Sequence, residues 1–225
     1  MSDARARSRR YCGGMRILIL SLAILLSPLP LAARDVAGRF DYYVLALSWQ
    51  PAWCTRTGDG RDAPECRAGT GRDFTTHGLW PQYERGWPQD CTTPERDPAR
   101  RETASMEDIM GSGRLAWHQW QKHGRCTGLS AADYYDATRR ATAAITIPAV
   151  FNDLARPITL PPAVIEEAFL EANPDHEADG ITVICRDGAL TELRICLTRD
   201  LEPRACAPDV RRDCSQPRLL MEAVR

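Results

Sequence analysis

The sequence predicts a single α+β domain, with a central antiparallel β-sheet flanked by helices and stabilised by disulfides. Strand-like and helix-like segments are segregated along the chain instead of alternating, which is typical of this class. The chain also holds nine cysteines. With 225 residues, 44% hydrophobic and 26% charged, it can bury a sizeable core, and this composition excludes a disordered chain, a coiled coil and a collagen-like repeat.

Residues 1–33 have the pattern of a secretory signal peptide. Five arginines end at Arg16, a mostly apolar run extends from Ile17 to Leu26, and small residues at Ala32 and Ala33 suit a cleavage site. A membrane anchor is the alternative, but this run is well short of the roughly 20 residues that span a bilayer. A pair of arginines also suggests a twin-arginine signal. We therefore expect domain 34–225 to be secreted or periplasmic, with no membrane attachment after cleavage.

Residues 40–49 are rich in aromatic and β-branched side chains and predict a buried strand. Residues 55–73 and 84–104 are rich in glycine, proline and charged residues and predict loops. Serine followed three residues later by aspartate is a helix-capping pattern, and a proline pair suits the start of a further helix. We expect helices over 105–126, 130–144 and 162–172, and an antiparallel hairpin over 181–185 and 190–197 with Asp187-Gly188 at its turn.

Eight cysteines remain after the predicted signal peptide. An even number in an exported chain predicts four disulfides, and the spacing alone leaves many pairings open. A zinc site is the alternative, but the sequence has no Cys-x-x-Cys pair, so no metal is expected. The eight residues are Cys54, Cys66, Cys91, Cys126, Cys185, Cys196, Cys206 and Cys214.

The charge balance limits how a polyanion could bind. The whole chain has a net charge of −1, but residues 34–225 carry 24 basic and 29 acidic side chains. A polyanionic substrate would therefore have to be held by a local patch, against the mean field of the domain.

Three of the four histidines lie in two short motifs, Phe-Thr-Thr-His-Gly-Leu-Trp-Pro at 74–81 and Trp-His-Gln-Trp-Gln-Lys-His-Gly-Arg-Cys at 117–126. Positions three and four apart share a helix face, so Gln119, Lys122 and His123 align and His118 lies over Lys122. Trp117 and Trp120 can face the core together. The only lysine of the chain is on this face. His176, in a polar loop, is assigned no role.

This set of residues favours acid–base chemistry on a phosphodiester. His118 and His123 are five apart and do not make a zinc pair, the chain has no G-x-S-x-G elbow, and paired cysteines leave no thiol nucleophile. One imidazole can take a proton from a nucleophile while another donates one to the leaving group, and a cation stabilises the pentacoordinate phosphorus. No metal is needed if the nucleophile is the 2′-hydroxyl of RNA.

At these residues the sequence resembles the ribonuclease T2 family of secreted, disulfide-bonded endoribonucleases. The segment 77–81 is similar to the family's first active-site motif, and 118–126 is similar to its second. Leu47-Ser48-Trp49 resembles the opening strand and Asn173-Pro174 part of the C-terminal region. The resemblance covers residues 40–214, and it implies a ribonuclease T2-like catalytic domain over 34–225.

The resemblance implies a role for each site residue. His77 is the general base toward the 2′-hydroxyl and His123 the general acid for the 5′-oxygen. Lys122 stabilises the phosphorane, His118 binds phosphate, and Trp80 either stacks on a base or packs in the core. The family cleaves single-stranded RNA through 2′,3′-cyclic phosphates to 3′-phosphates, so the implied partner is RNA and not DNA. A monomer is expected.

Three positions depart from the family pattern. Gln119 stands where many members have glutamate, Arg125 replaces a threonine, and Gln82 replaces the aspartate of the base pocket in fungal members, so base preference is not transferred. Loss of a carboxylate at Gln119 removes support for protonated imidazoles and predicts a slower or acid-shifted enzyme. The alternative is that Gln119 only orients a neighbour.

The resemblance and sequence proximity together imply the disulfide pairing. The implied pairs are Cys54–Cys66, Cys91–Cys126, Cys185–Cys214 and Cys196–Cys206.

Two other functions stay open. A non-catalytic RNA-binding or inhibitory relative should lack His77 or His123, and both are present. A metal-dependent phosphodiesterase should have a carboxylate–histidine cluster near the motifs, where the sequence offers Asp73 alone. We therefore predict an endoribonuclease that uses no metal or other cofactor.

Overall fold

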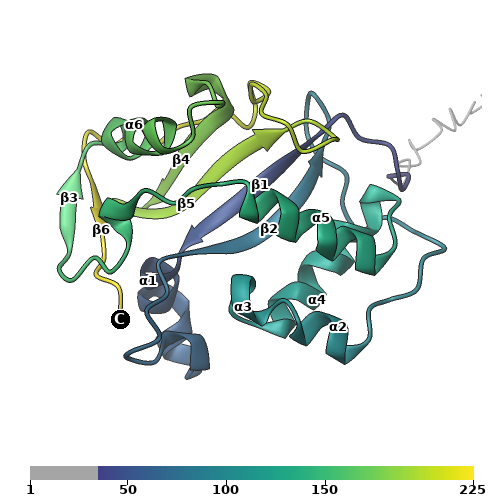
Figure 1. Cartoon of the computed structure of the whole chain (residues 1–225), viewed down its shortest axis with the longest axis horizontal. Helices are drawn as coiled ribbons and strands as arrows, with labels where there is room; N and C mark the ends of the chain where they lie inside the picture. The colour runs from purple at the N-terminus through teal and green to yellow at the C-terminus, as the bar shows by residue number, and fades with distance from the viewer. Residues whose placement is uncertain (1–34) are drawn as a thin grey trace, which may run out of the picture. The chain divides into compact units, whose positions relative to one another are not determined.

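A six-stranded sheet forms the centre of the structure, a computed structural model that describes residues 35–225 (Figure 1). The predicted signal peptide lies outside the described residues. The strand order is β2-β1-β5-β6-β3, and β4 pairs with β5. All pairings are antiparallel except the short one between β5 and β6. The strands are β1 (Tyr42–Trp49), β2 (Phe74–Gln82), β3 (Ile158–Leu160), β4 (Ile181–Arg186), β5 (Ala189–Leu197) and β6 (Leu219–Met221).

One face of the sheet carries the main hydrophobic core. Leu45 and Leu47 of β1 and Phe74 of β2 belong to this core, and Phe74 packs edge-on against Phe169 of α6 with ring centroids 5.2 Å apart. Helix α5 crosses the same face beside β1 and β2 (Figure 1). The helices are α1 (Gln50–Trp53), α2 (Arg100–Ala104), α3 (Glu107–Met110), α4 (Gly113–Lys122), α5 (Ala131–Ala143) and α6 (Pro162–Ala172).

The other face of the sheet is only partly covered. Alternation along β1 sends Tyr42 and Val44 to this face, where they join a small apolar cluster around the Cys196–Cys206 bridge. The next residues of β1 on this face are Ala46 and Ser48, which are small. The middle of the face therefore has room for other groups, and the candidate active site lies there.

The segment before the second motif differs from the prediction. The helix expected over 105–126 is divided at Gly111, whose φ of +82° ends α3, and α4 starts anew behind Ser112. The side chain of Ser112 accepts a hydrogen bond from the Leu115 amide at 3.4 Å, so the cap lies later than predicted. The region 84–104, predicted as a loop, contains the short helix α2.

The helices α5 and α6 and the β4–β5 hairpin agree with the prediction, whereas the region 55–73, predicted as a loop, contains short helical turns. Ser130 caps α5 by accepting from the Asp133 amide at 3.2 Å, and α6 starts at Pro162. Asp187 and Gly188 both have positive φ at the turn between β4 and β5, as a tight hairpin requires. The α+β class with a mainly antiparallel sheet is confirmed.

The four disulfides pair as the resemblance implied. The bridges join Cys54–Cys66, Cys91–Cys126, Cys185–Cys214 and Cys196–Cys206. No helix within residues 35–225 is long and apolar enough to cross a bilayer.

Candidate active site

A β-bulge places His77 on the partly covered face of the sheet. The register between β1 and β2 shifts between Ala46 and Leu47, and His77 is the extra residue. Side chains three apart on a regular strand point to opposite faces, but a bulge re-aims them. His77 and Trp80 consequently lie together, with ring centroids 5.1 Å apart.

Strand β5 brings a carboxylate to His77. Glu192 and Arg194, two apart on one face of the strand, lie opposite Ser48 and Ala46 of β1. The Glu192 side chain is hydrogen-bonded to His77 Nδ1 at 2.7 Å and accepts from Arg194 Nε at 2.8 Å. Burial acts to raise the pKa of Glu192, but the hydrogen bond and charge of His77, together with Arg194, outweigh it and hold the pKa below its ordinary value. Glu192 is therefore a buried carboxylate.

Helix α4 approaches the edge strand β2 through Gln119. The Gln119 side chain is buried, and its Oε1 accepts a hydrogen bond from Trp80 Nε1 at 2.7 Å. A Cβ atom at Gly78 would collide with that same oxygen and with the Trp80 indole nitrogen, so the close approach needs glycine. Since an indole N–H only donates, the amide NH₂ of Gln119 points away from Trp80.

His123 follows the last turn of α4 and stacks on Trp80. The ring centroids are 5.3 Å apart and the planes differ by 29°. His123 is 7% exposed, and its Nδ1 has no hydrogen-bond partner among residues 35–225. Burial lowers the pKa of His123 to about 3, with smaller contributions from the charges of Lys122, His77 and His118. The His123 ring is therefore neutral at neutral pH.

Lys122 and His118 lie at the margin of this cluster. Lys122 is half-buried in the last turn of α4. His118 is exposed and lines a separate cavity of about 620 Å³ with Arg100 and Arg114. Among the described residues, His118 makes no hydrogen bond to another candidate site residue. The structure thus brings His77, Trp80, Gln119 and His123 into contact and leaves His118 beside them.

The site residues lie within a region that matches a known family. Residues 40–206 match the sequence model of a family described as "Ribonuclease T2 family". The chain belongs to the ribonuclease T2 family. The matched region contains His77 and His123.

One relative matches this T2 ribonuclease over nearly its whole length. A protein named ribonuclease from Aeromonas hydrophila is 31% identical over 223 residues, which are 94% of this chain and 100% of that protein. The fold is similar to an RNase-related protein from Calystegia sepium, with a TM-score of 0.67 at 18% identity over 83% of this chain and 99% of that one. It is also similar to RNase NT in complex with 5′-AMP, with a TM-score of 0.52 at 23% identity over 75% and 95% of the two chains.

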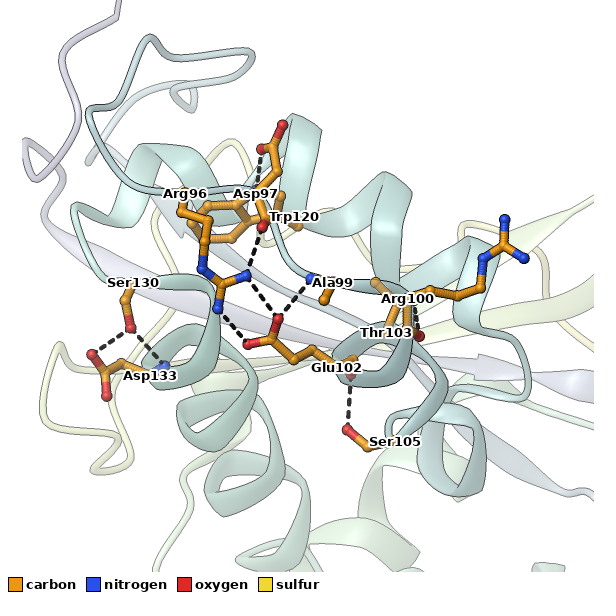
Figure 2. Close-up of polar contacts among 10 residues, drawn as sticks. All are labelled: Arg96, Asp97, Ala99, Arg100, Glu102, Thr103, Ser105, Trp120, Ser130 and Asp133. Carbon is orange, nitrogen blue, oxygen red and sulfur yellow. Dashed lines mark hydrogen bonds and ion pairs between the residues drawn. The ribbon is translucent and has the colours of Figure 1, made fainter.

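Arg125, which departs from the T2 pattern, helps to fix the end of α4. Its guanidinium binds both oxygens of Asp97, at 2.7 and 2.9 Å. Asp97 also accepts from Trp120 Nε1 at 2.8 Å (Figure 2). The hydrogen bonds of Arg125 and Trp120 hold the pKa of Asp97 below its ordinary value. Together with the Cys91–Cys126 bridge, this clamp ties the second T2 motif to the preceding loop.

The loop is fixed in turn by Glu102 of α2. Its carboxylate accepts from the Ala99 amide at 2.6 Å and from both terminal nitrogens of Arg96, at 2.9 and 3.0 Å (Figure 2). This cap holds the chain on either side of Asp97, which gives Trp120 a fixed partner.

Sequence reasoning missed Glu192 and Arg194. Their only signal was a pair of polar residues two apart on a predicted strand, and the pairing of β5 with β1 gives that signal its meaning. The pairing of tryptophans was wrong in part: Trp120 is fully buried, but Trp117 is half-buried and lines the cavity with His118. His176 lies outside the site, as expected.

Proposed function

We propose that this T2 endoribonuclease cleaves single-stranded RNA without a metal, by transphosphorylation through 2′,3′-cyclic phosphates to 3′-phosphate ends. One observation carries the proposal. Two imidazoles lie 5.1 and 5.3 Å from the Trp80 ring, in opposite electrostatic surroundings. One is neutral through burial and the other is bound to a carboxylate, which are the states that a general base and a general acid need.

The contacts favour His123 as the base, which exchanges the two roles that the resemblance implied. A neutral ring with a lowered pKa can accept the proton of the 2′-hydroxyl as that oxygen attacks phosphorus. Among residues 35–225, His123 has no carboxylate partner that would balance an imidazolium before substrate binds. Lys122, next in the chain, disfavours a proton on His123 in the free enzyme.

His77 is the acid in this proposal and Glu192 is its positioning residue. The carboxylate holds Nδ1 at 2.7 Å, which orients the ring and leaves Nε2 to face the substrate. The same carboxylate balances the charge of the ring when it carries the proton destined for the 5′-oxygen. Proton transfer to that oxygen breaks the P–O5′ bond and completes formation of the cyclic phosphate.

The remaining residues bind the phosphate and the base. Lys122 supplies positive charge to the phosphorane, and the amide NH₂ of Gln119 donates to a phosphate oxygen. His118, which is exposed on α4, binds a phosphate. The Trp80 ring stacks on His123 and has the Arg194 guanidinium 5.4 Å from its centroid. A base would have to displace one of these groups to stack on Trp80, and such stacking is worth about 1–3 kcal/mol per base.

RNA is the proposed partner, and the protein acts as a secreted or periplasmic monomer. The solved complex of RNase NT with 5′-AMP shows a structural neighbour with a nucleotide, which supports this choice. DNA lacks the 2′-hydroxyl nucleophile and should not be cleaved. Four disulfides and the signal-like residues 1–33 support export, with 34–225 as the mature catalytic domain.

The test is cleavage of a defined RNA by the exported protein in the presence of a chelator. We expect cyclic-phosphate products, full activity with chelator, and no cleavage where a single 2′-deoxy residue precedes the scissile phosphate. His77→Ala and His123→Ala should each lose about 10²–10⁴-fold. RNA binding without cleavage would instead support the non-catalytic alternative, and cleavage at the 2′-deoxy position would contradict the mechanism.

A further inference from the structure

A groove of about 380 Å³ opens beside His77 on the same side of the sheet. It is lined by Ser48 of β1, Thr191 of β5, the end of β4 and the segment after α1 that contains Thr57. A volume of this size is in the range of sites that hold a small organic ligand such as a nucleotide. Of the residues in the two active-site motifs, only His77 lines the groove.

Three arginines from three separate elements line this groove. They are Arg56 after α1, Arg186 at the end of β4 and Arg194 in β5. Arg194 is bound to Glu192, and Arg56 is bound to Asp187 at 2.8 Å. Within residues 35–225, Arg186 makes no ion pair. The groove therefore keeps positive charge that its own carboxylates do not balance.

We propose that this groove binds the phosphate that follows the scissile one toward the 3′ end of a single-stranded RNA. The inference rests on the proposed function, because the groove begins at His77, the proton donor to the 5′-oxygen. The RNA that leaves with that oxygen continues toward its 3′ end, so its next phosphate is the one that can reach the arginines.

The side chains of the groove suit a phosphodiester. Guanidinium groups bind phosphate oxygens in bidentate geometry and are more weakly hydrated than ammonium groups. The hydroxyls of Ser48 and Thr57 add neutral donors, while the Thr191 hydroxyl already donates to the Ile184 carbonyl at 3.1 Å. Residues 34–225 carry 29 acidic and 24 basic side chains, so a polyanion must be held by a local basic patch. The groove supplies such a patch.

Asp187 allows a test in the opposite direction. Its side chain is 75% exposed, so its ion pair with Arg56 contributes little in water and a phosphate can replace it. Its φ is +52°, a conformation that asparagine also adopts readily. Asp187→Asn therefore keeps the turn and releases Arg56 for the ligand.

The experiment compares a dinucleotide with the same dinucleotide extended by two nucleotides at its 3′ or its 5′ end. In the wild type we expect kcat/KM to rise on 3′ extension more than on 5′ extension. Arg186→Gln should remove about 5-fold of that gain and leave dinucleotide cleavage unchanged. Arg156→Gln is the matched control, since Arg156 is exposed just before β3, at the opposite edge of the sheet from β2.

Binding is measured separately with 2′-O-methyl oligonucleotides, which the enzyme cannot cleave. Arg186→Gln should weaken binding of the 3′-extended ligand and reduce the slope of log K against log salt by about 0.7, the value for one phosphate contact on a single strand. Asp187→Asn should strengthen binding. Equal affinities for the wild type and both variants would overturn the groove even if RNA is cleaved. Groove-dependent binding without any cleavage would contradict the proposed function instead.

Discussion

His77 and His123 are the same side chain in opposite surroundings. His123 is buried against Trp80 near Lys122, and burial lowers its pKa to about 3. His77 is 35% exposed in its side chain and bound to Glu192. This contrast arises from placement: α4 delivers one ring into the interior, and the bulge of β2 delivers the other to a carboxylate. This contrast is the basis of the proposed mechanism, in which His123 accepts a proton and His77 donates one.

Glu192→Gln tests the carboxylate with little change of shape. Glutamine can still accept from His77 Nδ1 but carries no charge to balance a protonated ring. We expect kcat to fall about 10-fold or more with KM little changed, since general acid catalysis contributes about 10²–10⁴-fold.

The control for Glu192→Gln is Glu167→Gln, an exposed glutamate of α6. It should leave kcat and KM as in the wild type. If Glu192→Gln lowered kcat only as far as a lower Tm explains, its role would be structural only.

Gln119→Glu tests the departure from the family pattern. A glutamate can accept the same hydrogen bond from Trp80, and it adds negative charge near the buried His123. The pKa of His123 should rise from about 3 toward the ordinary value. We expect the acid limb of kcat/KM and the NMR titration of His123 to move to higher pH. An unchanged titration would show that this position orients Trp80 and has no electrostatic effect.

At the scale of elements, the site depends on how β2 meets α4. The bulge turns His77 toward Trp80, and Gly78 lets Gln119 approach the strand. Both features lie inside the first motif. The motif thus encodes a local geometry as well as a reactive side chain.

Gly78→Ala should separate α4 from β2. The added methyl group collides with Gln119 and with the Trp80 nitrogen, so the helix must shift or the hydrogen bond must break. Overpacking of this kind costs about 1–3 kcal/mol. We expect a lower Tm and a loss of kcat/KM larger than the stability change explains.

Gly60→Ala is the matched control, because a Cβ there meets no atom within 4 Å. Its activity should equal that of the wild type. A fully active, stable Gly78→Ala variant would show that the contact between α4 and β2 is not needed.

Elements with local signals were predictable, and those that depend on distant partners were not. The Ser130 cap and the Asp187-Gly188 turn act within a few residues, and both are confirmed. The break at Gly111 was missed because glycine is also tolerated inside helices. Glu192 is 115 residues from His77 along the chain, and only the register of β5 on β1 brings them together.

Across the whole molecule, the two faces of the sheet differ: one carries the main hydrophobic core and the other carries the candidate active site. Helices α5 and α6 cover one face. The other face carries polar side chains between short segments that disulfides hold in place. A titratable side chain that is buried on the polar face, such as His123, therefore affects the stability of the fold as well as activity.

Acidification should reveal this link through His123. Its pKa is about 3 in the folded protein and ordinarily about 6.5 when unfolded, so the unfolded chain binds more protons between these values. Stability must therefore fall as pH drops below about 6.5, by at most ~1.4 kcal/mol per pH unit from this residue. Urea unfolding at pH 7 and pH 5 measures it.

His123→Phe should lose less stability than the wild type over that interval, because phenylalanine cannot take up the proton. His118→Phe, at an exposed histidine of the same helix, is the control. Equal losses in the wild type and His123→Phe would contradict a neutral buried His123.

The lysine in the last turn of α4 gives the protein a chemical handle. Lys122 is the only lysine of the chain, and it adjoins His123. Reagents that acylate amines therefore find, besides the terminal amino group, a single target at the place where RNA would bind. Intact-mass spectrometry would count one such adduct, and protection by a nucleotide would report occupancy. Coupling the enzyme to a support through Lys122 would consequently block the site that the support is meant to display.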